Sequence, residues 1–321
     1  MLILTKKSVI LKSKKNYIMG RKTSIKPSNN NIGTERTVSY PVHEFDNYFK
    51  EDYAIIMNPV PYLKRIIFDI PRRVVGNSII LITKGTAHAT FNFKDYPIKA
   101  GDILMVPDDN ILSINKFSND VTPWMVSGNF NSPIEKELVG FDTIFMHLSQ
   151  EEFKVVEKYF TLMHTIASKP IYGPDDFKHL FFSLMYRIRE MHNERVGNNK
   201  QTFTSSSKQL TANFINILIH QDVPMPNIKH FARTLGVSEN HLSITVKKET
   251  NITVKKWIER KTEATMRMLL IDEANYSLED ICNIIGYSSP PQVVRFFKRR
   301  TGMTPFEFRK AKLNEKALLN L

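Results

Sequence analysis

Hydrophobic and polar positions follow two different periods, and the change near residue 149 divides the chain. Between residues 53 and 131, short runs rich in β-branched and aromatic residues alternate with Gly, Pro, Asn and Asp, which is typical of antiparallel strands joined by tight turns. The pattern predicts strands at residues 65–70, 78–83, 87–93, 103–106, 111–117 and 124–130. Several short strands at this spacing favour an antiparallel sandwich or barrel.

From residue 149 the apolar positions recur at helical spacing. Residues 151–167 and 175–192 each carry a wide apolar stripe, and Ser149 is placed to cap the first of these helices. Residues 193–209 are polar and predict a linker. Beyond the linker the pattern predicts helices at residues 210–220, 227–235, 238–250, 253–271, 277–285, 289–301 and 304–312. Ser277 with Asp280, and Thr304 with Glu307, have capping-box spacing.

These elements predict an α+β multidomain chain. We expect a basic, disordered arm at 1–35, an antiparallel β-barrel at 36–145, and a helical hairpin for packing or dimerisation at 146–192. The linker at 193–209 then leads to an all-α domain at 210–321. Translation could start at Met1 or at Met19, and the pattern does not decide between them.

The charge is concentrated at the two ends of the chain. With 45 Lys and Arg against 32 Asp and Glu, the formal net charge is +13. Residues 1–30 hold 8 basic residues and no acid, and residues 225–321 hold 17 basic and 10 acidic residues, whereas the middle is nearly neutral. This asymmetry favours nucleic acid as a partner of the C-terminal third. The one cysteine, Cys282, excludes a disulfide framework and multi-thiolate metal sites, and we expect it to be a small core residue.

Two C-terminal segments share one design. In the first, a helix ends at Gly236 and Ser238 opens the next helix; in the second, a helix ends at Gly286 and Ser289 opens the next. A helix, a tight glycine turn and a capped second helix form a helix-turn-helix, whose second helix enters the DNA major groove.

The predicted second helix of each segment has one apolar and one polar face. In the later helix Val293, Phe296 and Phe297 form the core stripe. The opposite face carries Gln292, Arg295 and Arg299, with Lys298 and Arg300 beside it. In the earlier helix Leu242 and Val246 point inward, and the residues that point away are Asn240, Ser243, Ile244 and Lys247. Arginine can bond guanine through two atoms, and glutamine can do the same for adenine. The alternative interpretation is that residues 298–300 are merely a solvated basic face.

The helix between the two segments has a length suited to DNA. Residues 253–271 predict a rod of about 30 Å, and successive major-groove entries on one face of B-DNA recur about every 34 Å. One monomer is therefore expected to reach two successive turns.

Residues 227–310 resemble the DNA-binding domain of the AraC/XylS family of bacterial transcription regulators. IGYSSPPQVVRFFKRRTGMTPFEFRK (285–310) is similar to the family signature, and FARTLGVSENHLSITVKKET (231–250) is similar to the first motif. The resemblance implies base-reading positions at Asn240, Ser243, Ile244, Gln292 and Arg295. Ile244 stands where the family often has Arg, and Pro290-Pro291 replace polar residues at the second helix start.

The same resemblance implies a cupin-like barrel that binds a small effector, followed by dimerising helices. Residues 53–130 look like such a barrel, with KAGDILMVP (99–107) similar to the cupin Gly-Asp…Pro turn. Metal-dependent cupin enzymes place two histidines one residue apart. His88 stands alone in AHATF, so we expect neither a metal nor another cofactor, and the pocket residues stay unidentified.

We therefore predict a cytoplasmic, sequence-specific regulator of transcription, most simply an activator, that is not an enzyme. Its expected partners are double-stranded promoter DNA, RNA polymerase, a small-molecule effector and a second copy of the chain, with no membrane contact. The predicted phosphate contacts are Lys247, Lys255, Lys298 and Arg299. Two alternatives remain: a cupin-type enzyme with a basic helical appendage, and a nucleic-acid-binding protein without sequence preference.

Overall fold

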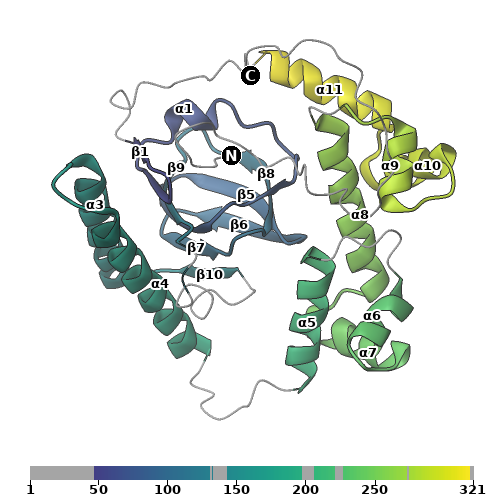
Figure 1. The fold of residues 1–321 in the computed structure, drawn as a ribbon, viewed down its shortest axis with the longest axis horizontal. Helices are drawn as coiled ribbons and strands as arrows, with labels where there is room; N and C mark the ends of the chain where they lie inside the picture. Colours follow the sequence, from purple (N-terminus) through teal and green to yellow (C-terminus); the bar gives the residue numbers. More distant parts are fainter. Residues whose placement is uncertain are drawn as a thin grey trace.

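The structure is a computed structural model that describes residues 47–130, 132, 143–196, 206–220, 227–272 and 275–318. A β-rich N-terminal part is flanked on one side by a helical hairpin and on the other by the C-terminal helices (Figure 1). The predicted basic arm, residues 1–35, lies outside the described residues. No helix among those described is both long and apolar enough to cross a bilayer.

The N-terminal strands form two antiparallel sheets. The six-stranded sheet has the order β1 (Asn47–Phe49), β2 (Tyr53–Ile56), β9 (Thr122–Gly128), β4 (Asn77–Lys84), β7 (Asp102–Val106), β10 (Ile144–His147). The four-stranded sheet has the order β3 (Arg72–Arg73), β8 (Ile111–Phe117), β5 (Thr86–Phe91), β6 (Lys94–Lys99). A short helix, α1 (Val60–Leu63), lies between β2 and β3. This layout confirms the predicted fold class.

The six-stranded sheet is buried on both faces. Ile80 and Leu104 point into a core shared with Phe91 and Leu112 of the four-stranded sheet. Their neighbours on the opposite face pack against two helices, α3 (Gln150–Ser168) and α4 (Pro174–Val196). Burial on both faces explains why β7 is a continuous apolar run rather than an alternating one.

The helical hairpin begins where the sequence predicted. Ser149 accepts a hydrogen bond from the Glu152 backbone N–H, and the Glu152 carboxylate accepts one from the Ser149 N–H, which completes a capping box. The predicted linker is shorter than expected, because α4 continues to Val196 and α5 begins at Ser206.

The C-terminal part contains every helix that the pattern predicted. The described helices are α5 (Ser206–His220), α6 (Ile228–Thr234), α7 (Glu239–Thr250), α8 (Val254–Ile271), α9 (Leu278–Ile285), α10 (Pro290–Thr301) and α11 (Pro305–Leu318). They pack into two cores, one built mainly from α5–α7 and the N-terminal part of α8, the other from the rest of α8 and α9–α11.

The predicted strand at residues 65–70 is wrong. These residues form an irregular loop between α1 and β3. Ile67 and Ile70 are buried, as expected of a strand, but they pack against the C-terminal core that contains Met266 and Phe297. A hydrophobic run can be buried by another domain without any strand partner, and periodicity alone does not distinguish the two cases.

The β-domain also contributes to the other C-terminal core. Phe93, at the turn between β5 and β6, is buried with Phe214 and Trp257. The Arg260 guanidinium donates to the Phe93 carbonyl at 2.6 Å, and that of Arg73 donates to the Ile219 carbonyl at 3.2 Å. The two parts of the molecule are therefore joined by apolar and polar contacts at both C-terminal units.

Candidate DNA-binding surface

The first unit consists of α6, a glycine turn and α7. Asn227 caps α6 by accepting from the His230 N–H at 2.9 Å. Gly236 adopts a φ of +69°, a left-handed conformation that glycine adopts without steric cost, and the following N–H, of Val237, donates back to the Ala232 carbonyl at 3.0 Å. Ser238 then caps α7.

The second unit repeats this construction in α9 and α10. Gly286 has a φ of +80°, and the next N–H, of Tyr287, donates to the Cys282 carbonyl at 3.0 Å. Ser277 and Asp280 form the predicted capping box at the start of α9. Ser289 occupies the cap position of α10 without a side-chain hydrogen bond, and Pro290 and Pro291 fill the first turn, where the missing N–H groups need no helical partner.

Helix α8 runs through both units. Val254 and Trp257 belong to the first core, and Met266 and Leu270 belong to the second. Its 18 residues correspond to about 27 Å, close to the spacing of successive major grooves. Figure 1 shows α6 and α7 near one end of α8 and α9 and α10 near the other.

The predicted base-reading side chains of α7 lie at the surface. Asn240 is exposed, Ser243 is half-buried, and Ile244 is 59% exposed although it is apolar. Leu242 and Val246 are fully buried on the opposite face, as predicted. Lys247 is exposed in the last turn of α7, and Lys255 is exposed in the first turn of α8.

The predicted contacts of α10 separate into free and tethered side chains. Arg295 and Lys298 are exposed, and Gln292 is half-buried. The Arg299 side chain is 68% exposed, and its guanidinium lies 5.7 Å from the centre of the Phe296 ring and 3.9 Å from a Glu259 carboxylate oxygen. The Arg299 side chain is therefore exposed to solvent and also contacts Phe296 of the same helix.

Arg300 does not belong to the exposed basic face. Its side chain is only 22% exposed, and Nε donates to the Glu263 carboxylate of α8 at 2.9 Å, with Glu259 3.9 Å away. The expectation that residues 298–300 form one basic face is therefore corrected: α10 presents Lys298 and Arg299 outward, and Arg300 fastens it to α8.

The end of the sequence signature has a structural role. Arg309 Nε donates to the Leu270 carbonyl at 2.9 Å, and its Nη2 donates to the Tyr276 carbonyl. Phe308 packs edge-on against Phe297, with the Arg267 guanidinium 5.2 Å from the centre of its ring. These contacts hold α11 against the end of α8 and thereby fix the second unit.

A sequence comparison identifies the domain that contains both units. The profile of the helix-turn-helix domain family of the AraC type matches residues 231–311, which span both units. The chain is a DNA-binding regulator of transcription that carries this domain at its C-terminal end.

Curated relatives agree with this assignment. The regulator is 24% identical over 241 residues to the Msm operon regulatory protein of Streptococcus mutans, covering 72% of this chain and 83% of that protein. It is 27% identical over 105 residues to the uncharacterized HTH-type transcriptional regulator YtdP of Bacillus subtilis, covering 33% of this chain and 14% of that protein. Among solved structures, an apo ToxT variant from Vibrio cholerae is similar over 82% of this chain and 95% of its own, with 9% identity and a TM-score of 0.40.

The remaining candidates are ordinary structural residues. Cys282 is buried as predicted, and its thiol donates to the Tyr287 carbonyl at 2.9 Å, which supports the turn of the second unit. His88 is half-buried on β5, with Nδ1 3.4 Å from the Asn115 side-chain oxygen. Within the described part of the chain, no three His, Cys, Asp or Glu residues gather closely enough to hold a metal ion. The cupin-enzyme alternative is not favoured, and the regulator binds DNA to control transcription.

Proposed function

We propose that the regulator reads promoter DNA by placing α7 and α10 in two successive major grooves. The observation that carries the proposal is that two units of the same construction, each with an exposed polar face on its second helix, are fixed at opposite ends of one rod about 27 Å long.

In this proposal the base-reading side chains are Asn240, Ser243 and Ile244 on α7 and Gln292 and Arg295 on α10. Arg295 offers two parallel donors suited to guanine O6 and N7. Ile244 is an exposed apolar side chain without a packing role among the described residues, which supports contact with a thymine methyl group.

Lys247, Lys255, Lys298 and Arg299 are proposed to contact phosphates. All four are exposed, and they lie on α7, α8 and α10. Each phosphate contact releases counterions on binding, so these residues supply affinity that depends on salt but not on base sequence.

A pair of substitutions on α10 tests the division of roles. Binding is measured on a library in which every position of a footprinted site is varied. Arg295→Ala is expected to lose about 1–3 kcal/mol at one base position only. Lys298→Ala is expected to weaken binding on all sequences alike and to reduce the salt slope by about one unit.

The result that would favour binding without sequence preference is a uniform loss in Arg295→Ala with no change in the base profile. A stoichiometric metal ion bound to the purified protein would instead support the alternative that the β-domain is a cupin-type enzyme.

We further propose that the regulator acts in the cytoplasm as an activator that contacts RNA polymerase, and that a small molecule bound to the β-domain or dimerisation controls it. The outer face of the α3–α4 hairpin supports dimerisation, because Val155, Leu162 and Tyr186 are exposed there while the inner face packs on the sheet. Light scattering of Leu162→Glu is expected to report a smaller mass than wild type. An unchanged mass would assign this face to another role.

A further inference from the structure

The two helix-turn-helix units are joined in two ways. Along the chain, α8 runs from the core of the first unit into the core of the second. The β-domain makes the other connection, because it places Phe93 in the first core and Ile67 and Ile70 in the second. Two bodies joined by one helix rotate relative to each other when that helix bends. A second connection opposes this motion if its own two ends are held at a fixed distance.

The loop that enters the second core is attached to β8. The Asp69 backbone N–H donates to the Ile114 carbonyl at 2.8 Å, and the Asp69 carboxylate accepts from the Asn115 side-chain amide at 3.0 Å. Asp69 lies directly before Ile70, so these bonds hold the buried isoleucine at the side of the strand.

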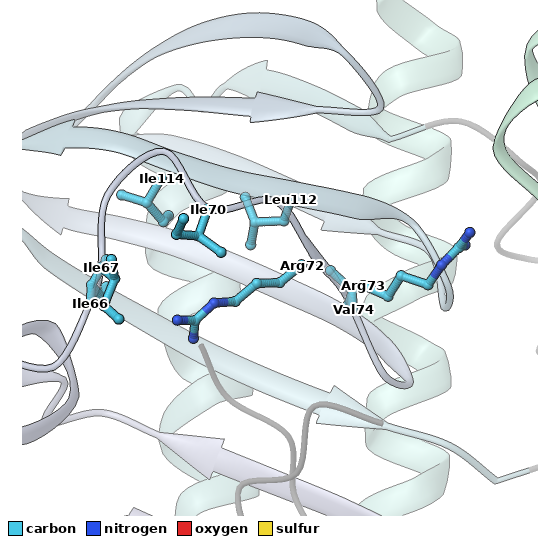
Figure 2. Close-up of a pocket in the computed structure, with 8 residues that line it drawn as sticks. All are labelled: Ile66, Ile67, Ile70, Arg72, Arg73, Val74, Leu112 and Ile114. Carbon is cyan, nitrogen blue, oxygen red and sulfur yellow. The ribbon is translucent and has the colours of Figure 1, made fainter. Parts of the chain in front are cut away.

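Further contacts fix the same loop along β8. Figure 2 shows Ile70 beside Leu112 and Ile114, and the three side chains line one pocket. Directly after the loop, Arg72 of β3 pairs with Leu112. The loop at residues 66–70 is therefore held to β8 by a side chain, by the backbone and by the sheet that follows it.

The turn that enters the first core is attached to β8 in the same way. The Asn92 N–H donates to the Ile111 carbonyl at 2.8 Å, and the Ile111 N–H donates to the Asn92 side-chain oxygen at 2.9 Å. Asn92 lies directly before Phe93, as Asp69 lies before Ile70. Asn92 and Asp69 also share a positive φ, of 45° and 59°, which Asn and Asp tolerate better than most residues.

The attachment points have the same spacing on α8 as on β8. Arg260 donates to the Phe93 carbonyl and Arg267 donates to the Asp69 carbonyl at 3.1 Å. Seven positions of a helix rise about 10.5 Å. On β8 the corresponding residues are Ile111 and Ile114, and three positions of a strand rise about 10 Å. The helix and the strand therefore hold the two attachments at matching distances.

Each attachment continues to a recognition helix. In the second unit, the Glu263 carboxylate accepts from Arg267 at 3.1 Å and from Arg300 of α10 at 2.9 Å. In the first unit, Phe93 packs in the same core as Val246 of α7. Displacement of either attachment would therefore shift the helix that is proposed to enter the DNA.

We propose that β8 and α8 form a closed frame that fixes the distance and rotation between α7 and α10, so that the β-domain determines the half-site spacing that the regulator accepts. The half-sites are the DNA segments contacted by α7 and by α10. One extra base pair between them moves the second segment by about 3.4 Å and turns it by about 35°. A framed pair of units cannot follow this change without breaking the attachments at Asp69 or Asn92. The spacing rule rests on the proposed function, whereas the rigidity of the frame does not.

Substitutions at the two positive-φ residues test the frame. Asp69→Gly together with Asn92→Gly removes both side-chain attachments to β8, while glycine accepts both backbone conformations without steric cost. Asp69→Asn is the matched control, because it removes the charge and keeps the oxygen that accepts from Asn115.

Distances between two spin labels measure the rigidity without DNA. The labels are placed on the full chain at Lys229→Cys of α6 and Asn314→Cys of α11, which are both exposed, whereas the native Cys282 is buried. We expect a narrow distance distribution in the otherwise unsubstituted chain and in Asp69→Asn, and a clearly broader one in the double glycine variant. An equally narrow distribution in the double glycine variant overturns the frame.

A variant on the other side of the interface guards against misfolding of the β-domain. Arg260→Met removes the hydrogen bond to the Phe93 carbonyl and leaves every residue of the β-domain in place. It is expected to broaden the label distribution in the same direction. Thermal unfolding shows that each variant is folded at the temperature of the measurement, and a folded Arg260→Met with an unchanged distribution contradicts the attachment at Phe93.

Binding to sites of altered spacing tests the consequence for DNA. One base pair is inserted or deleted at the centre of a footprinted site. Wild type and Asp69→Asn are expected to lose at least about tenfold in affinity, and the double glycine variant is expected to lose less than about threefold relative to its own binding at the original spacing. Equal losses overturn the role of the β-domain in spacing. A wild-type footprint that does not cover two successive major grooves contradicts the proposed function instead, and the label distances still test the frame.

Discussion

At the scale of single residues, neighbouring arginines in this chain have opposite surroundings. Arg72 faces the sandwich interior and Arg73 pairs with Asp109; Arg299 projects outward and Arg300 binds Glu263. The sequence predicted the polar face of α10, because a 3.6-residue period fixes which side chains oppose the core. It did not predict which basic residue is tethered, since Glu259 and Glu263 lie about 40 positions earlier and only the packed fold brings them close.

The tether predicts different phenotypes for the adjacent residues. Arg300→Ala is expected to lower the free energy of unfolding by about 1 kcal/mol, because it breaks a partly buried ion pair, and to leave the salt slope of DNA binding unchanged. Arg299→Ala is expected to leave stability nearly unchanged and to reduce that slope by about one unit. Urea denaturation and binding titrations across salt measure the two quantities, and equal slopes for both variants would contradict the assignment.

At the scale of elements, local signals predicted the helices well. Ser238, Ser277 and Thr304 each accept the hydrogen bond expected of a cap, and both turn glycines take positive φ. Such signals lie within a few residues of each other, so the sequence contains them completely.

The strands were harder to predict. β6 was missed because its sequence, KDYPIK, is mostly polar and contains a proline, which is tolerated because this strand lies at the edge of its sheet. The pocket between the loop at residues 66–70 and β8 could not be predicted either. Its lining residues Ile66 and Ile114 are 48 positions apart in the sequence, and the loop has the hydrophobic pattern of a strand.

The capping boxes predict acid sensitivity of the second unit. Hydrogen bonds from the Ser277 side chain and backbone lower the pKa of Asp280, and the Thr304 backbone and side chain do the same for Glu307. A carboxyl with a folded-state pKa below its unfolded value stabilises the fold fully above the unfolded value, near pH 4, and this stabilisation is lost as the pH falls through the folded value.

Asp280→Asn should therefore melt below wild type at pH 7, and the difference should shrink as the pH falls from about 5 to about 3. Differential scanning fluorimetry across this range provides the measurement. Glu279→Gln, an exposed neighbour in the same first turn that is not part of the capping box, serves as the control. A difference that stays constant with pH would mean that the carboxylate charge does not contribute to the cap.

At the scale of the whole molecule, the β-domain completes both cores of the DNA-binding domain. Phe93 enters the first core from a turn in which Asn92 and Phe93 both have positive φ, at 45° and 68°. Such a conformation is unfavourable for a bulky residue, and glycine is preferred there. The burial of the Phe93 ring by the C-terminal domain offsets this local strain.

Phe93→Gly separates the two effects. Glycine suits the turn of the β5–β6 hairpin, so the substitution relieves strain there. The first unit loses a buried ring, and emptying a phenylalanine core position lowers the free energy of unfolding by about 3–5 kcal/mol. Calorimetry is expected to show the transition of the C-terminal domain at lower temperature and that of the β-domain unmoved or raised. Phe93→Leu, which refills part of the space, should recover part of the shift. A parallel fall of both transitions would show that the turn itself needs the phenylalanine.

The loop at residues 66–70 bears on how such regulators can be recombined. Chimeras usually assume that a sensor and a reader can be exchanged at the linker between them. Here Ile67, Ile70 and Phe93 belong to the β-domain by sequence and to the cores of the DNA-binding domain by packing. A DNA-binding domain joined to a foreign β-domain would have an unfilled space in each of its two cores. A stable hybrid therefore has to include these three side chains, or the helices that pack against them have to be redesigned.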